Sequence, residues 1–218
     1  MLFGYFDESG IFAPKKDGGH LLKFTIGGCV ASFDEWEGMS LNWAGALAGM
    51  NIPMFHMTDF ESRTGHFNGW TEANRKARLN TLLEIIGSIK PHCYGFTNIV
   101  RAGEEDLPSI YERCAQEVLL ALSRYSDDLS IIFAHHPEYK RHRGLYDAFV
   151  GLGMEGKIRS CTTAHPVDIL PLQAADIVAY EVRCEAREGE REGERPMRYP
   201  LNTLIDFGCS FRFSSAVD

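Results

Sequence analysis

The sequence predicts an α/β domain in which a mixed β-sheet is flanked by helices. Three observations carry this prediction: apolar segments of strand length, longer segments with helical periodicity, and the order in which the two kinds follow one another. Two strand-like segments open the chain, and strands and helices then alternate along it. This order is typical of a sheet that combines antiparallel and parallel strands and carries helices on its faces.

The first half of the chain opens with two predicted strands. Residues 2–7 (LFGYFD) are apolar on both alternating faces until the last position, as expected of a strand covered on both sides. A loop rich in Lys and Gly leads to residues 22–31 (LKFTIGGCVA), so the two strands are expected to be antiparallel neighbours. Residues 34–49 are expected to be helical, and Thr71 is expected to cap a stronger helix that Pro91 stops.

The second half continues the alternation. Pro108 opens a helix whose apolar residues recur about one turn apart, and Pro171 opens the last clear helix. The other expected elements are strands at 92–100, 129–134 and 157–163 and a weak helix at 143–151. The last helix leads into a glycine-broken charged run near 186–196, which we interpret as a solvated loop or a helix extension.

Length and composition fit one folded domain. The 218 residues fall within the range of a single large α/β domain, and a hydrophobic fraction of 44% supports a substantial core. We therefore expect residues 1–218 to form one domain. The net charge of −8 gives an overall field that repels nucleic acid, so nucleic-acid binding would need a local basic strip or metal ions.

The cysteines and the apolar segments indicate the compartment. None of the six cysteines forms a C-x-x-C pair, which argues against a structural zinc site. Several lie in apolar segments, as reduced core thiols do. The chain opens without the features of a secretory signal and contains no apolar run long enough to cross a membrane. A reducing cytoplasm is the expected location.

Two carboxylates are the leading candidates for chemistry. Asp7 ends an apolar strand, where a lone buried carboxylate needs a cation, a metal ion or hydrogen-bond donors. The alternative is a turn-capping role in which Asp7 accepts the amides of Ser9 and Gly10. Asp176 lies about 40° from Leu172 on a helical wheel, at the rim of the apolar arc. Its small neighbours allow close approach to the sheet, so a metal ion or a long-range ion pair is expected there.

The segment FHMTDFES supplies three further candidate metal ligands, His56, Asp59 and Glu61. Thr58 to Glu61 fits the capping-box pattern T-x-x-E, which would occupy Glu61 with a backbone amide. For His56 the alternative is a hydrogen-bonded core histidine. We therefore favour His56 and Asp59 over Glu61 as ligands.

Two histidines and a basic cluster follow the predicted strand LSIIFA. Adjacent residues of an extended chain face opposite ways, so at most one of His135 and His136 points at a common site, and His136 is the candidate ligand. The cluster of Lys140, Arg141 and Arg143 is a candidate phosphate clamp. An ordinary basic surface loop is the alternative for this cluster.

Three motifs follow one another along the chain. They are the DESG that ends the first strand (Asp7, Glu8, Ser9, Gly10), an F-H-x-x-D element (Phe55, His56, Asp59) and an L-Q-x-A-D helix (Leu172, Gln173, Ala175, Asp176). In this order they resemble the bacterial domain-of-unknown-function 3800 family over nearly the whole chain. The resemblance implies a ribonuclease-H-like fold with Asp7 and Asp176 as active-site carboxylates. It also implies that Glu8 and Gln173 belong to the catalytic motifs.

The chain departs from ribonuclease-H-like enzymes at the fourth strand, where such enzymes commonly carry another acid. Here the strand ends in Ala134-His135-His136. A histidine ligand at this point would favour manganese over magnesium. Otherwise another carboxylate completes the site, the candidates being Asp59, Glu61 and Asp168. A third alternative is a site that binds one metal ion, or none well.

Together with the resemblance, these residues predict a metal-dependent nuclease that hydrolyses phosphodiester bonds of RNA or DNA with one or two Mg²⁺ or Mn²⁺ ions. G-x-S-x-G, P-loop, G-x-G-x-x-G and H-E-x-x-H motifs are absent from the sequence, which disfavours other common chemistries. The alternatives are a degenerate ribonuclease-H-like binding protein and a small-substrate metal phosphatase. Nucleic acid is the expected partner, and a second copy of the chain or another protein is left open.

Overall fold

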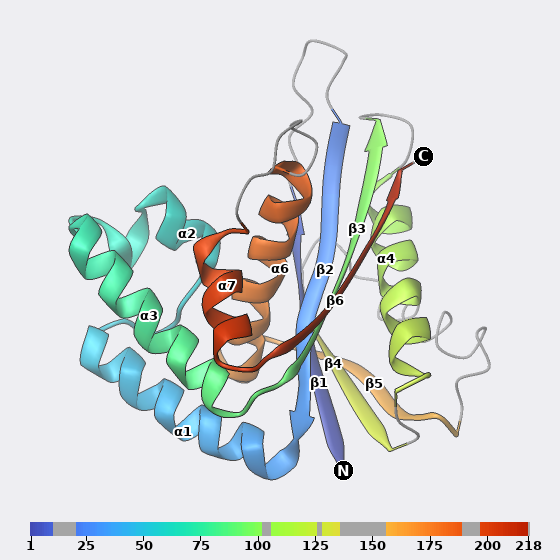
Figure 1. Cartoon of the computed structure of the whole chain (residues 1–218), viewed down its shortest axis with the longest axis horizontal. Helices are drawn as coiled ribbons and strands as arrows, with labels where there is room; N and C mark the ends of the chain where they lie inside the picture. Colours follow the sequence, from blue (N-terminus) through green and yellow to red (C-terminus); the bar gives the residue numbers. More distant parts are fainter. Residues whose placement is uncertain (11–20, 102–105, 126–127, 136–155, 189–196, 218) are drawn as a thin grey trace.

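The computed structural model describes residues 1–10, 21–101, 106–125, 128–135, 156–188 and 197–217. Within this part of the chain, six strands form one mixed sheet in the order β5-β4-β1-β2-β3-β6. Helices cover both faces of the sheet (Figure 1). The arrangement confirms the predicted α/β class and is compatible with a ribonuclease-H-like fold.

Three strands form an antiparallel meander in the sheet. β1 (Leu2–Gly10) pairs with β2 (Leu21–Ser32), and β2 pairs with β3 (His92–Arg101). The predicted antiparallel pairing of the first two strands is therefore confirmed. β1 runs beyond the predicted end at residue 7, so Asp7 lies within the strand and not at a turn.

The remaining strands run parallel to their neighbours. β4 (Leu129–Ala134) lies beside β1, and β5 (Ile158–Ala164) lies beside β4. The carboxyl ends of β1, β4 and β5 therefore meet at one edge of the sheet, which is where open α/β sheets place their ligands. At the far edge β6 (Ser210–Val217), a strand that the sequence analysis does not predict, pairs with β3.

One face of the sheet carries most of the helices. α6 (Pro171–Glu188) packs directly on β1, β2 and β3, and the other helices of this layer surround it (Figure 1). Those helices are α1 (Phe33–Met50), α2 (Met57–Ser62), the short 3₁₀ helix η1 (Gly65–Phe67), α3 (Glu72–Ser88) and α7 (Tyr199–Asp206). An apolar core that includes Trp43, Phe55 and Leu82 fills the space between them.

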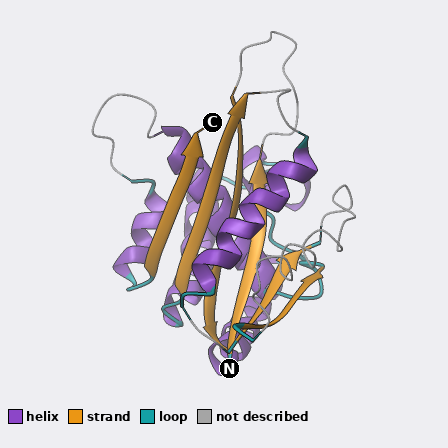
Figure 2. Ribbon diagram, turned by 90° about the vertical axis from the view of Figure 1, so that its right-hand side faces the viewer, coloured by secondary structure: helices purple, strands orange, loops and turns teal. Residues whose placement is uncertain are grey.

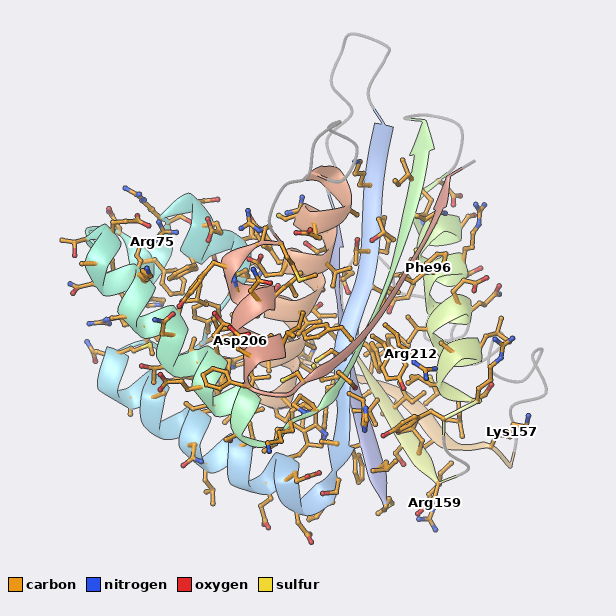
Figure 3. The ribbon with its side chains drawn as sticks, in the orientation of Figure 1. Arg75, Phe96, Lys157, Arg159, Asp206 and Arg212 are labelled. Atoms are coloured by element: carbon orange, nitrogen blue, oxygen red, sulfur yellow. The ribbon has the colours of Figure 1, made fainter. Side chains whose placement is uncertain are left out.

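The opposite face is covered by α4 (Leu107–Leu122), as the turned view in Figure 2 shows. α4 contacts β2 and β3, and its apolar side chains form a second core with Phe6, Phe24 and Phe96. Figure 3 places Phe96 on the side of the sheet that α4 covers. The central strands are thus apolar on both faces, as the first predicted strand requires.

The helix boundaries follow sequence signals. Ser32 and Glu35 form a capping box at the start of α1, and the Thr71 side chain accepts a hydrogen bond from the Asn74 amide at the start of α3. α3 ends shortly before Pro91, as predicted. The expected helix at 143–151 and most of the charged run near 186–196 lie outside the described residues. Among the helices that are described, none combines the length and apolar character needed to span a membrane.

Candidate functional site

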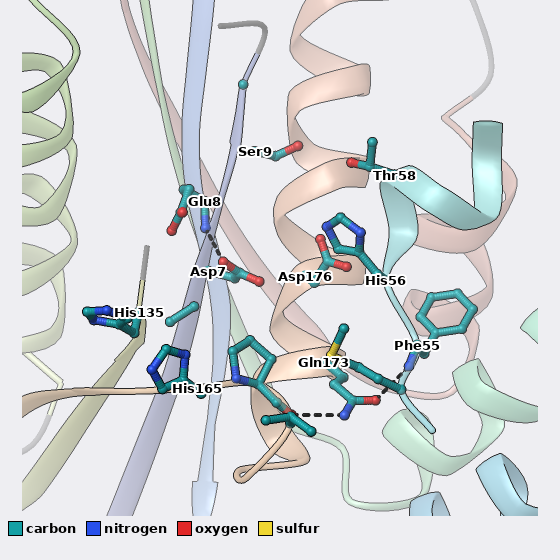
Figure 4. A pocket seen from close by; sticks show the side chains of 15 residues that line it. Asp7, Glu8, Ser9, Phe55, His56, Thr58, His135, His165, Gln173 and Asp176 are labelled. Carbon is teal, nitrogen blue, oxygen red and sulfur yellow. Dashed lines mark hydrogen bonds between the residues drawn. The ribbon is translucent and has the colours of Figure 1, made fainter. Parts of the chain in front are cut away.

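A cleft of about 530 Å³ opens at the carboxyl ends of β1, β4 and β5. It is bounded by these strand ends, by the start of α6 and by the segment that leads into α2. Figure 4 shows that its polar side chains come from all of these elements. The predicted site residues Asp7, Glu8, His56, Gln173 and Asp176 all line this cleft.

Asp7 enters the cleft from the α6 face of β1. Its register partner on β2 is Gly27, and its Oδ1 accepts the Glu8 amide at 2.8 Å. Because β1 continues through Gly10, no turn follows Asp7, and the turn-capping alternative is wrong. The half-buried side chain is therefore directed toward the helix that carries Asp176 (Figure 4).

Asp176 is brought to the sheet by small residues on α6. A Cβ added to Gly27 would lie 2.6 Å from the Ala179 Cα, so the helix backbone sits directly on the strand there. Ala179 is about one turn beyond Asp176, which holds that carboxylate against β1 with only 5% of its surface exposed. Asp176 Oδ2 accepts the Met57 amide at 2.6 Å. The predicted close approach of this helix is confirmed.

The three acids of the cleft all have raised pKa values. Burial raises the pKa of Asp7 well above its usual range, and the charges of Glu8 and Asp176 raise it further. Burial raises the pKa of Asp176 to about 6, although His56 and the Met57 amide oppose this. Burial also raises the pKa of Glu8 to about 7. Among the described residues, no salt bridge joins these acids to a Lys or Arg. The charge of Arg183 also lowers the pKa of Asp176, but its guanidinium donates to the Ser9 hydroxyl at 2.8 Å and not to a carboxylate.

His56 and Asp59 form an oriented pair at the rim of the cleft. His56 Nδ1 lies 3.0 Å from Asp59 Oδ2, and the Thr64 hydroxyl donates to Asp59 Oδ1 at 3.1 Å. The pairing with His56 lowers the pKa of Asp59. A carboxylate that holds one ring nitrogen directs the other nitrogen toward the site, as in carboxylate–histidine–metal arrangements. Figure 4 places His56 beside Asp176.

Gln173 holds the walls of the cleft together. Its Oε1 accepts hydrogen bonds from Trp43 Nε1 at 3.0 Å and from the Phe55 amide at 2.9 Å. Its Nε2 donates to the Pro166 carbonyl at 2.9 Å. The fully buried amide thus joins α1, the segment before α2 and the loop before α6. Both the oxygen and the nitrogen of this amide therefore make hydrogen bonds that hold the walls of the cleft.

Glu61 points away from the cleft. Its carboxylate lies 3.6 Å from Arg75 Nη2, near a separate pocket between α2, α3 and α7. The predicted capping box does not form, because α2 begins at Met57 with His56 at the N-cap and without a side-chain capping bond. The structure therefore does not bring Glu61 together with Asp7 and Asp176.

Two histidines of the cleft lie on the parallel strands. His135 follows β4 and His165 follows β5, and their rings contact edge to face with centroids 4.4 Å apart. The sequence analysis does not include His165, although it follows a predicted strand just as His135 does. His136 lies outside the described residues, as do the three cluster residues Lys140, Arg141 and Arg143.

In the described part of the chain, no three His, Cys, Asp or Glu side chains are grouped closely enough to enclose a metal ion. Asp168, considered above as an additional acid, is exposed, and its amide donates to the His165 carbonyl at 3.0 Å. The acids that face one another are thus Asp7 and Asp176. Comparison with known proteins adds nothing further: no family model and no curated protein matches the chain.

Proposed function

We propose that this cleft hydrolyses phosphodiester bonds of nucleic acid with divalent metal held by Asp7 and Asp176. The observation that carries the proposal is the meeting of two carboxylates from β1 and α6, without a Lys or Arg salt bridge among the described residues. The charge of Asp176 raises the pKa of Asp7, and a carboxylate beside a like charge favours the approach of a cation. A divalent metal ion bound between the two carboxylates would supply the positive charge that offsets their repulsion.

The donor set fits Mg²⁺ or Mn²⁺ bound together with substrate. Mg²⁺ commonly uses one or two protein carboxylates and completes its shell with water and substrate phosphate. A pair of acids that does not by itself enclose an ion agrees with this mode. When bound, such an ion activates a water molecule and stabilises the leaving oxygen. It also offsets the repulsion between phosphate and a chain of net charge −8.

The surrounding residues have separable roles in this proposal. Asp7 and Asp176 present oxygen ligands from two rigid elements, which fixes the direction in which their lone pairs point. His56, held at Nδ1 by Asp59, presents Nε2 to the cleft as a proton donor or acceptor for the reacting oxygens. Gln173 keeps the segment that carries His56 in place through the Phe55 amide.

The test is cleavage of fluorescently labelled RNA and DNA oligonucleotides, single-stranded and duplex, in Mg²⁺ or Mn²⁺. Wild-type protein is expected to cleave at least one of them, and Asp7→Asn is expected to lose at least a thousandfold in rate with an unchanged circular dichroism spectrum. Asp206→Asn, at an exposed position on α7, is the matched control and keeps the parental rate. Parental cleavage by Asp7→Asn would contradict the proposal.

A binding protein of the same fold is the second candidate. It is favoured by the end of β4, where the described chain carries His135 and not an acid. In that case the wild-type protein binds labelled oligonucleotides in a gel-shift assay but leaves them intact in every metal ion. Turnover of a chromogenic phosphate monoester with intact oligonucleotides would instead identify a small-substrate phosphatase.

A further inference from the structure

Arg183 is a buried cation close to the carboxylates of the cleft. It lies on α6, seven positions beyond Asp176, and only 8% of its surface is exposed. At about 100° per residue the two positions are about 20° apart around the helix axis, so the helix face that presents Asp176 to β1 presents Arg183 as well. The charge of Arg183 lowers the pKa of Asp176, which shows that the guanidinium acts on the acid pair.

Two contacts fix the direction of this guanidinium. Its Nε donates to the Ser9 hydroxyl at 2.8 Å, and its Cζ lies 4.7 Å from the centroid of the Tyr180 ring. Ser9 lines the cleft and shares the α6 face of β1 with Asp7, because side chains alternate along a strand (Figure 4). These two positions of β1 are about 7 Å apart. Arg183 is therefore anchored at the wall of the cleft, one step along the strand from Asp7.

The contacts leave the outer edge of the guanidinium unused. Within the described residues, Arg183 forms no salt bridge, and its hydrogen bond uses Nε alone. Its Nη1 and Nη2 are not among the buried nitrogens that lack a partner, so both reach solvent. A guanidinium remains charged and can donate two parallel N–H bonds to the oxygens of one phosphate. Arg183 thus holds two oriented donors for an anion.

The charge of Arg183 calls for an anionic partner from outside the described residues. A largely buried cation is costly unless it is paired, and here the hydrogen-bond acceptor is a neutral hydroxyl. No Lys or Arg is among the described residues that line the cleft, and Arg183 lies directly behind one of them, Ser9. It is therefore the arginine best placed to meet a phosphate that extends past the acid pair.

We propose that Arg183 binds a backbone phosphate of the nucleic-acid strand, next to the phosphate that is cleaved at Asp7 and Asp176. The inference rests on the proposed function, which supplies the strand. Ser9 and Tyr180 hold the guanidinium so that Nη1 and Nη2 meet the phosphate oxygens. Phosphate contacts fix the register of a strand and do not read its sequence. Arg183 thus helps to set which linkage of the strand lies at the acid pair.

The experiment measures the salt dependence of oligonucleotide binding. Binding of a fluorescently labelled, single-stranded phosphorothioate oligonucleotide, which is not cleaved, is followed by anisotropy at a fixed Mg²⁺ concentration and increasing NaCl. The slope of log affinity against log salt counts phosphate contacts, so Arg183→Gln should reduce it by roughly 0.7 and weaken binding about tenfold or more. Arg159→Gln removes an exposed arginine at the other end of the parallel strands and should change neither.

A second variant separates phosphate binding from a structural role. Arg183→Lys keeps the charge but loses the two-pronged donor, so it should keep the wild-type slope and bind more weakly than wild type. Thermal unfolding of each variant checks that it is folded. Equal slopes for wild type and folded Arg183→Gln, wild-type affinity in Arg183→Lys, or no saturable binding by wild type would each overturn the inference. Displacement of the strand by inorganic phosphate at equal ionic strength would also overturn it, because the site would then serve free phosphate. Cleavage is not measured, so a failure of the nuclease proposal is seen separately.

Discussion

Replacing Asp176 by Asn is expected to stabilise the metal-free protein. Burial raises the pKa of Asp176 from 3.8 to about 6. At about 1.4 kcal/mol for each pH unit, the ionised carboxylate costs the fold roughly 3 kcal/mol above that pH. The amide keeps an acceptor for the Met57 N–H but makes a weaker bond, so the net gain is about 2 kcal/mol. For a chain of this size the midpoint of thermal unfolding should rise by about 4–8 °C.

The gain has a defined pH dependence. The folded-state pKa of Asp176 lies above the unfolded value. The stabilising contribution of this side chain to the free energy of unfolding is therefore fully present below about pH 4, and it is lost as the pH rises through about 6. The pKa values of Asp7 and Glu8 are raised as well, so ionisation of these two acids also destabilises the fold as the pH rises. Thermal unfolding in chelator should therefore show wild type and Asp176→Asn with similar midpoints at pH 4, and the variant well above wild type at pH 8.

A matched control and a metal titration complete the assay. Asp206→Asn removes an exposed carboxylate on α7 (Figure 3) and should leave the midpoint unchanged at both pH values. Added Mn²⁺ with oligonucleotide should raise the midpoint of wild type and not that of Asp176→Asn. A variant that melts at or below wild type at pH 8 would refute the argument that burial of this carboxylate outweighs the favourable charges of His56 and Arg183.

Three further substitutions test the packing and the hydrogen bonds that hold the residues of the cleft in place. Gly27→Val should destabilise the protein by about 1–3 kcal/mol in urea unfolding and abolish cleavage, because a Cβ there meets Ala179 Cα at 2.6 Å; Gly38→Ala, with open space around it, should do neither. Gln173→Leu leaves the Trp43 and Phe55 donors without their acceptor and should cost about 2–4 kcal/mol in the same assay. Asp59→Asn should lower kcat/KM about 10–100-fold without changing the unfolding midpoint, since it releases the orienting bond to a cleft histidine.

The fold class and the two carboxylates Asp7 and Asp176 could be predicted from local patterns in the sequence. Apolar alternation identifies β1 and β2, and a small-residue seam on a helix indicates close packing against a strand. Asp7 and Asp176 are visible because each is a carboxylate at a position whose neighbours are buried. Their proximity follows once the helix that carries Asp176 must cover the strand that carries Asp7.

The remaining features depend on contacts between distant segments. Nothing in the neighbours of Gln173 shows that its amide meets the Trp43 indole and the Phe55 amide, far away in the chain. The capping-box pattern at Glu61 failed because the helix begins at Met57, one residue before Thr58, which the motif would place at the N-cap. His165 becomes informative only when the parallel pairing of β4 and β5 sets it beside His135.

The central claim is that Asp7 and Asp176 share a divalent cation. Its most direct test is electron paramagnetic resonance of Mn²⁺ titrated into the protein with a non-cleavable phosphorothioate oligonucleotide, which separates free from bound ion. Wild type and Asp206→Asn should bind Mn²⁺ with equal affinity, and Asp7→Asn and Asp176→Asn should each lose at least tenfold. Equal Mn²⁺ affinity in all four proteins, or no bound Mn²⁺ in wild type, would contradict the account.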